Sequence, residues 1–117
     1  MRRGIILILI VVLAIAPAAL VFASGDQEDG VQRHAFIFKN TGNPYGDKQM
    51  EGFEEGIEEQ GYEAILRAPD QPTAEAQIQI IDQLITQRVA SISITGNDFD
   101  ALEPVLTRAM DEGIVVI

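Results

Sequence analysis

The chain contains no cysteine, and basic residues are scarce, with 8 Lys and Arg against 18 Asp and Glu among 117 residues. Without thiols, the sequence excludes cysteine nucleophiles, disulfides and Cys-ligated zinc within these residues. It also lacks the lipid-modified cysteine that would tether a bacterial lipoprotein. A formal charge of −10 repels phosphate backbones, so nucleic acid is not an expected partner. The length allows one domain at most.

The motifs that bind nucleotides are absent as well. The sequence has no G-x-G-x-x-G and no G-x-x-x-x-G-K-[ST]. A Ser-His-Asp arrangement is not evident, and the only histidine, His34, begins an apolar run where a structural role is expected. Many of the acids share one helical face, which we interpret as solvated: Glu51, Glu54, Glu55, Glu58 and Glu59. We therefore expect no enzyme, no cofactor and no bound metal.

The amino terminus has the pattern of an export signal. Two arginines precede an uncharged, almost wholly apolar run from Gly4 to Val21, interrupted by Pro17 near its end. Small residues follow, so residues 1–23 are predicted to form a hydrophobic signal helix that is cleaved after Ala23, which places the protein in the periplasm. An uncleaved membrane anchor is the alternative, because roughly 18–20 apolar residues can span a bilayer. Residues 24–32 are predicted to be a flexible acidic linker.

Residues 33–117 alternate between short apolar runs and amphipathic helical patterns. This order predicts right-handed βαβ units, and so an α/β fold with a parallel sheet and flanking helices. Predicted strands cover 35–38, 63–67, 90–94 and 114–117; predicted helices begin near 47, after Thr73, and after Asn97 or Asp98. The last strand is wholly apolar with no turn after it, so we expect the chain to be the front part of a longer protein.

Polar side chains follow two of the predicted strands. Because parallel strands end at the same edge of a sheet, these side chains are expected to face one cavity. Amides, carboxylates and an aromatic ring suit the hydroxyls and the apolar C–H face of a sugar or another polyol. The alternatives are that Asn43-Pro44 is a simple turn and that Asp98 is a simple helix cap. The candidate ligand-binding residues are Lys39, Asn40, Asn43, Tyr45, Asn97 and Asp98.

The loop Lys39-Asn-Thr-Gly-Asn-Pro-Tyr-Gly-Asp47 resembles the first loop of bacterial periplasmic sugar-binding proteins of the ribose-binding type, the substrate-binding proteins of ABC transporters. Further similar stretches follow in order at Pro72–Glu75, Gln77-Ile78, Asp98–Leu102 and Ala109–Gly113. The set is most similar to the branch that binds rhamnose or autoinducer-2. The resemblance extends over residues 33–117.

The resemblance implies a two-lobed type I periplasmic-binding-protein fold, of which this chain would be part of the first lobe. It implies an exported, monomeric protein that delivers a sugar or sugar-like polyol to an ABC permease. Lys39 and Asp98 match residues that contact ligand hydroxyls, and Asn43 and Tyr45 match the asparagine and first aromatic of the family's loop. Gly46 departs from the family, which usually has a second aromatic there. With one partial lobe, the chain alone is expected to bind weakly or not at all.

Three other classes carry related folds. A membrane-anchored sugar sensor would retain the amino-terminal segment. A flavodoxin-like enzyme would need a phosphate-binding loop, against which Pro44 argues because it lacks an N–H. A sugar-responsive repressor would carry a helix-turn-helix where this chain has its export signal.

Overall fold

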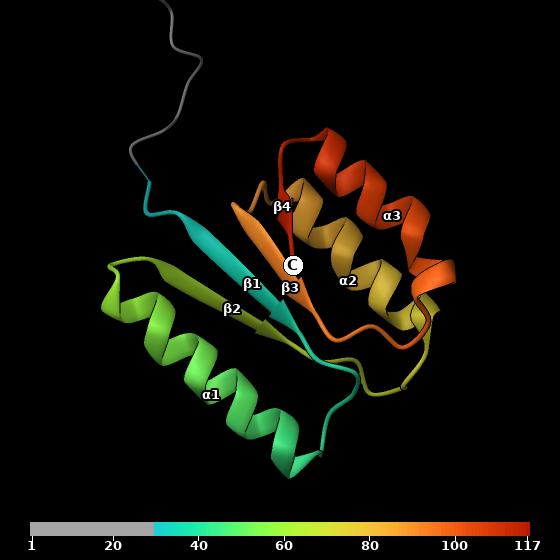
Figure 1. Cartoon of the computed structure of the whole chain (residues 1–117), viewed down its shortest axis with the longest axis horizontal. Coiled ribbons are helices and arrows are strands. Elements are labelled where there is room, and N and C mark those ends of the chain that lie inside the picture. The colour runs from blue at the N-terminus through green and yellow to red at the C-terminus, as the bar shows by residue number, and fades with distance from the viewer. Residues whose placement is uncertain (1–29) are drawn as a thin grey trace, which may run out of the picture.

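The computed structural model describes residues 30–117, and the predicted signal peptide therefore lies outside the described residues. This part of the chain alternates strictly between strand and helix (Figure 1). The elements are β1 (Arg33–Ile37), α1 (Pro44–Glu59), β2 (Glu63–Arg67), α2 (Ala74–Thr86), β3 (Ser91–Ile94), α3 (Phe99–Asp111) and β4 (Val115–Val116). Within residues 30–117, no helix is long and apolar enough to cross a membrane.

The strands form one parallel sheet in the order β2-β1-β3-β4. The chain goes from β1 to its neighbour β2, then passes over β1 to reach β3 on the other side. The direction of travel thus reverses between β1 and β3, which are paired up to Ile37 and Ile94. In open α/β sheets, such a reversal opens a crevice at the carboxyl ends of the two strands, and ligands bind there. The predicted fold class is confirmed.

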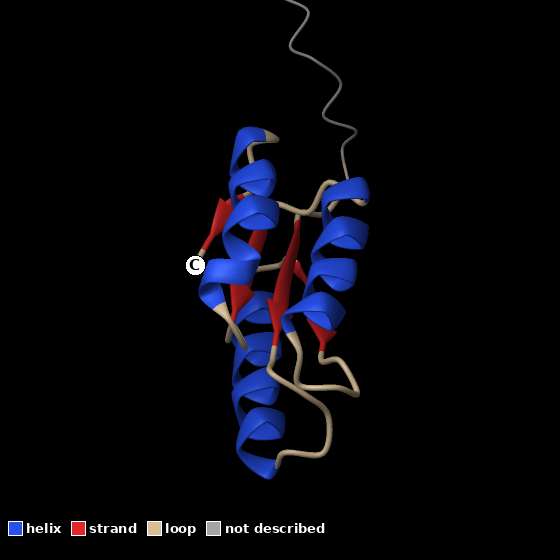
Figure 2. Cartoon of the chain, turned by 90° about the vertical axis from the view of Figure 1, so that its right-hand side faces the viewer, coloured by secondary structure: helices blue, strands red, loops and turns tan. Residues whose placement is uncertain are grey.

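The helices cover the two faces of the sheet (Figure 2). Successive strand residues point to opposite faces. Phe36 packs against Phe53 of α1, with ring centroids 5.4 Å apart, whereas its neighbours Ala35 and Ile37 join the core beneath α2 and α3. The apolar residues of that core are Ala35, Ile37, Ile65, Ala74, Ile81, Leu84, Val89, Ile92, Leu102, Val105, Leu106, Ala109 and Ile114.

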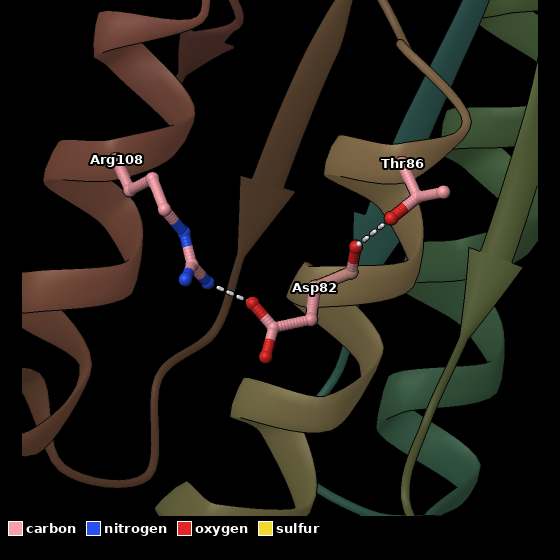
Figure 3. Close-up of polar contacts among 3 residues, drawn as sticks. All are labelled: Asp82, Thr86 and Arg108. Atoms are coloured by element: carbon pink, nitrogen blue, oxygen red, sulfur yellow. Dashed lines mark hydrogen bonds and ion pairs between the residues drawn. The ribbon is translucent and has the colours of Figure 1, made fainter.

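A polar contact joins α2 and α3 on their outer surface (Figure 3). The Arg108 guanidinium pairs with the carboxylate of Asp82, and both side chains are about half exposed. The Thr86 hydroxyl donates to the backbone carbonyl of Asp82 at 3.0 Å. Because both groups remain solvated, this pair contributes little compared with the apolar core beneath it.

Local cap chemistry explains most helix boundaries. Thr73 caps α2 as expected, and Asp98, one of the two residues expected to cap α3, does so; each accepts a backbone N–H with its side-chain oxygen. Helix α1 begins at Pro44, three residues before the expected start near Asp47. The physical reason is that Asn43 is a good N-cap and proline is well suited to the first helical position, which has no N–H to satisfy. The interpretation of Asn43-Pro44 as a simple turn was therefore wrong.

Candidate functional site

Two loops leave the sheet side by side at the carboxyl ends of β1 and β3. The last ladder bond there runs from Thr95 N to Ile37 O at 2.9 Å. Beyond it, residues 38–43 lead to α1 and residues 95–98 lead to α3. All the candidate residues lie in these loops or the first turn after them: Lys39, Asn40, Asn43, Tyr45, Asn97 and Asp98.

The side chain of Asn97 connects the two loops directly. Its Nδ2 atom donates to the backbone carbonyl of Lys39 at 2.9 Å, which leaves its Oδ1 atom as a spare acceptor. Asn40 is used differently, because its Nδ2 atom donates to the neighbouring Thr41 carbonyl at 2.8 Å. Asn97 therefore bridges the two loops, and Asn40 stabilises the β1–α1 loop itself.

Asn43 and Asp98 have corresponding positions as the N-caps of α1 and α3. Asn43 Oδ1 accepts from the amides of Tyr45 at 3.0 Å and Gly46 at 3.4 Å. Asp98 Oδ1 accepts from the amide of Ala101 at 3.2 Å. Capping uses one oxygen of each side chain, so Asn43 keeps its Nδ2 donor and Asp98 keeps its second carboxylate oxygen. A cap and a ligand contact are compatible at both positions.

Lys39 and Tyr45 are exposed, as is Asp98. Within residues 30–117 the ammonium of Lys39 makes no hydrogen bond or ion pair. The Tyr45 side chain is 68% exposed, and its hydroxyl accepts from Gln49 Nε2 at 3.3 Å. An aromatic ring held by its own helix and open to solvent can cover the apolar face of a ligand.

Gly46 is buried because the ring of Phe38 lies directly against it. A Cβ atom at Gly46 would overlap that ring. Gly46 stands where the resemblance implies a second aromatic residue. An aromatic side chain therefore has no room at this position.

Two residues were missed by the sequence reasoning. Phe99 is 60% exposed beside Asp98, and its ring lies over Gly96, where an added Cβ would come within 2.9 Å. Gln77 is fully buried in α2 and reaches both loops. The available signal was its spacing, because Gln77 shares an apolar helix face with Ile81 and Leu84.

The opposite edge of the sheet has a different character. His34 Nδ1 lies 2.7 Å from Ser91 Oγ, and its ring packs on Tyr62 with centroids 5.1 Å apart. His34 Nε2 is buried with no hydrogen-bond partner among residues 30–117. A shallow depression also lies away from the loops, lined by Ile85, Thr86, Arg88, Val89, Glu112, Gly113 and Ile114.

In the described part of the chain, no cluster of His, Asp and Glu could hold a metal ion.

The strand order of this α/β lobe reverses between β1 and β3, and polar loops gather at that point. This is the architecture of a ligand-binding domain. Residues 34–117 match the model of the periplasmic binding protein domain family. That match spans well over half of the chain, and the chain belongs to this family. The resemblance stated from the sequence is thereby confirmed.

Solved structures agree with this assignment. An ABC transporter solute-binding protein from Clostridium phytofermentas, with bound L-rhamnose, is 44% identical with a TM-score of 0.72; the match covers 74% of this chain and 27% of that protein. A solute-binding protein from Burkholderia graminis C4D1M in complex with D-arabinose is 26% identical with a TM-score of 0.63, covering 80% and 31%. LsrB from Clostridium saccharobutylicum in complex with AI-2 is 24% identical with a TM-score of 0.69, covering 72% and 26%, and shows the fold alone.

The chain spans between 26% and 31% of the length of these relatives. The ligand, transport role and partners of the whole protein are therefore matters for proposal.

Proposed function

We propose that the protein is the exported solute-binding component of an ABC transporter and that it binds a sugar or a sugar-like polyol. The observation that carries the proposal is the placement of spare polar groups at the switch point between β1 and β3. Relatives with this fold were solved with L-rhamnose and D-arabinose bound. Residues 34–117 would supply one wall of the site in the whole protein, meaning the full product of the gene that encodes this chain.

Each candidate group has a distinct task in this proposal. The ammonium of Lys39 donates to ligand hydroxyls, and the second carboxylate oxygen of Asp98 accepts from them. Asn43 contributes its Nδ2 donor, and Asn97 contributes its Oδ1 acceptor. The Tyr45 ring covers the C–H face of the sugar. Sugars present donors, acceptors and apolar C–H groups close together, so this mixture suits them better than it suits phosphate or a purely apolar ligand.

The site assignment is tested by titration calorimetry of the whole protein with L-rhamnose, D-arabinose and D-allose. Asp98→Asn is the sharpest variant, because asparagine caps a helix as well as aspartate does, while the charge is lost and the free carboxylate oxygen becomes an N–H donor. We expect its affinity for the best of these sugars to fall about tenfold or more, since a hydrogen bond to a charged group contributes about 1.5–3 kcal/mol. Unchanged affinity would remove Asp98 from the site.

The ring of Tyr45 is tested by a pair of variants. Tyr45→Phe keeps the stacking surface and loses only an exposed hydroxyl, so affinity should change less than threefold. Tyr45→Ala removes the surface, and affinity should fall about tenfold if the aromatic contact contributes roughly 0.5–1.5 kcal/mol beyond burial. Equal affinities for the two variants would show that the ring does not cover the ligand.

Export is tested separately from binding. We propose that the mature protein begins at Ser24, acts as a monomer in the periplasm and delivers its ligand to a membrane permease. Amino-terminal sequencing of the protein from the periplasm checks the first point. A sequence starting at Met1 or Arg2 would instead support a membrane-anchored sensor.

A further inference from the structure

Gln77 is a polar side chain with no exposed surface, held in the second turn of α2. It lies on the helix face that also carries Ile81 and Leu84, both of which belong to the apolar core. A buried amide is unfavourable unless its donors and acceptor are all paired. The partners of Gln77 therefore explain why a glutamine stands at a core position.

Backbone polar groups at the ends of β1 and β3 are left without partners in the sheet. Strands β1 and β3 remain paired as far as the bond from Thr95 N to Ile37 O. The two chains then part, because α1 and α3 cover opposite faces of the sheet. The carbonyl groups of Phe38 and Thr95 leave the ladder at the crevice and need donors from elsewhere.

The side-chain amide of Gln77 supplies these hydrogen bonds. Its Nε2 atom donates to Thr95 O at 3.0 Å and to Phe38 O at 3.3 Å. Its Oε1 atom accepts from the backbone N–H of Asn97 at 2.8 Å. Two carbonyl groups require a donor and an N–H requires an acceptor, so chemistry alone fixes the orientation of the amide.

The contacts of Gln77 continue into the site itself. Asn97, whose N–H is held by Gln77, donates from its own side chain to the carbonyl of Lys39. One buried side chain thus fixes the end of β1, the end of β3 and, through Asn97, the start of the β1–α1 loop. A core residue with three backbone partners defines a loop position more sharply than exposed contacts do.

We propose that Gln77 is a positioning residue that sets the separation of the two ligand-binding loops at the base of the crevice. It does not touch the ligand, because its side chain is 0% exposed. The proposal rests on the proposed function only for its affinity readout. The positions of the loops are properties of the free protein.

Three variants of the whole protein test this role. Gln77→Met keeps the length and volume of the side chain and removes all three hydrogen bonds. Gln77→Glu keeps the acceptor for Asn97 but turns a carboxylate oxygen toward two carbonyl groups. The matched control, Leu84→Ala, destabilises the same helix through a buried core side chain about two turns after Gln77.

The first readout is amide hydrogen exchange at Thr95 and Asn97 in the absence of sugar. We expect exchange at Asn97 to rise at least tenfold in Gln77→Met relative to the core amides of β1. In Leu84→Ala, exchange should rise in proportion throughout the domain. Equal behaviour of the two variants at Asn97 would overturn the proposal, because it would show that Gln77 contributes packing alone.

The second readout is affinity for L-rhamnose at a temperature where all variants are folded. Gln77→Met and Gln77→Glu should each lose about tenfold or more, while Leu84→Ala stays within about twofold. Wild-type affinity in Gln77→Met would refute the role of Gln77. If the wild-type protein bound none of L-rhamnose, D-arabinose and D-allose, the proposed function would fail instead, and hydrogen exchange would still decide the role of Gln77.

Discussion

The two loops of the candidate site are held in different ways. In the β3–α3 loop, residues 95–98, the backbone is fixed by a buried side chain, because Gln77 bonds Thr95 O and Asn97 N. The longer β1–α1 loop, residues 38–43, shares this support only at its first residue, where Gln77 donates to Phe38 O, and is otherwise held near the surface. There the Thr41 N–H donates to Pro69 O at 2.9 Å and the Thr41 hydroxyl lies 3.2 Å from Asp70 Oδ1.

This difference indicates a division of labour within one site. The β3–α3 loop takes its position from the core and presents a carboxylate and an amide oxygen. The β1–α1 loop presents the ammonium of Lys39, and the first turn of α1 presents the phenol ring of Tyr45, both on exposed side chains. Changes near the β1–α1 loop should alter that loop and leave the β3–α3 loop in place.

The largest expected effect comes from Gly46, which supports the end of the β1–α1 loop against Phe38. Gly46→Ala forces a Cβ atom into the Phe38 ring, and overpacking of this kind costs about 1–3 kcal/mol. The control is Gly52→Ala in the same helix, where an added Cβ meets nothing within 4 Å. Gly52→Ala should stabilise α1 by up to about 1 kcal/mol because alanine favours helix.

Urea unfolding of the two variants measures both effects. Opposite signs for Gly46→Ala and Gly52→Ala are expected. If Gly46→Ala were as stable as wild type, Phe38 would not be packed against Gly46. The reason given for the missing second aromatic would then be wrong.

Asn43 gives the next effect and separates capping from ligand binding in the β1–α1 loop. Asn43→Ala removes the oxygen that caps α1 and should cost about 1 kcal/mol of stability. Asn43→Asp keeps the cap and replaces the Nδ2 donor with a charged carboxylate oxygen. We expect wild-type stability but weaker sugar binding from Asn43→Asp, measured by urea unfolding and calorimetry. Unchanged binding in this variant would remove Asn43 from the site and leave it as a cap.

Much of the molecule could be predicted from its sequence. Strand and helix order, the parallel sheet and the cap at Thr73 depend on local patterns and were predicted, and the cap of α3 was narrowed to Asn97 or Asp98. The start of α1 was missed because Asn43-Pro44 suits a turn and a helix start equally well. Local patterns also placed all six candidate residues at one edge, because parallel strands end together.

The role of Gln77 could not be predicted from local spacing. Its partners Phe38 and Thr95 lie 39 and 18 residues away in the chain, and they offer backbone atoms that every residue has. Phe99 was missed for a related reason, since the place of its ring depends on close approach to the backbone at Gly96. Contacts made through backbone atoms leave no residue-type pattern in the sequence.

A smaller effect is expected where neither loop is touched. Arg108 pairs with Asp82 across α2 and α3 (Figure 3), and both side chains are about half exposed. Arg108→Gln should cost roughly 0.2–1 kcal/mol of stability. Sugar affinity should stay within about twofold of wild type, because the β3–α3 loop is held by Gln77 and not by this pair. A larger loss of affinity would mean that the spacing of α2 and α3 also sets the position of that loop.

The smallest effect is expected at Lys48, in the first turns of α1. A hydrogen bond to Glu51, its charge and the charge of Glu55 raise the pKa of Lys48 above its ordinary value of 10.5. Because the folded-state pKa is raised, the stabilising contribution is complete below pH 10.5 and is lost as the pH rises through the folded-state pKa. Lys48 is fully exposed to solvent, so 1 M salt should screen most of the contribution.

Lys48→Gln measures the contribution of the Lys48 charge to stability. Its dependence on pH and on salt shows whether the contribution is electrostatic. The variant should unfold at a slightly lower urea concentration than wild type at pH 7 in low salt. The difference should vanish in 1 M salt and at high alkaline pH, where the wild-type lysine is also neutral. Sugar affinity should not change, since Lys48 follows the β1–α1 loop without holding it. A salt-independent difference would mean that the lysine stem packs on α1, and the charge pair would then have no measurable role.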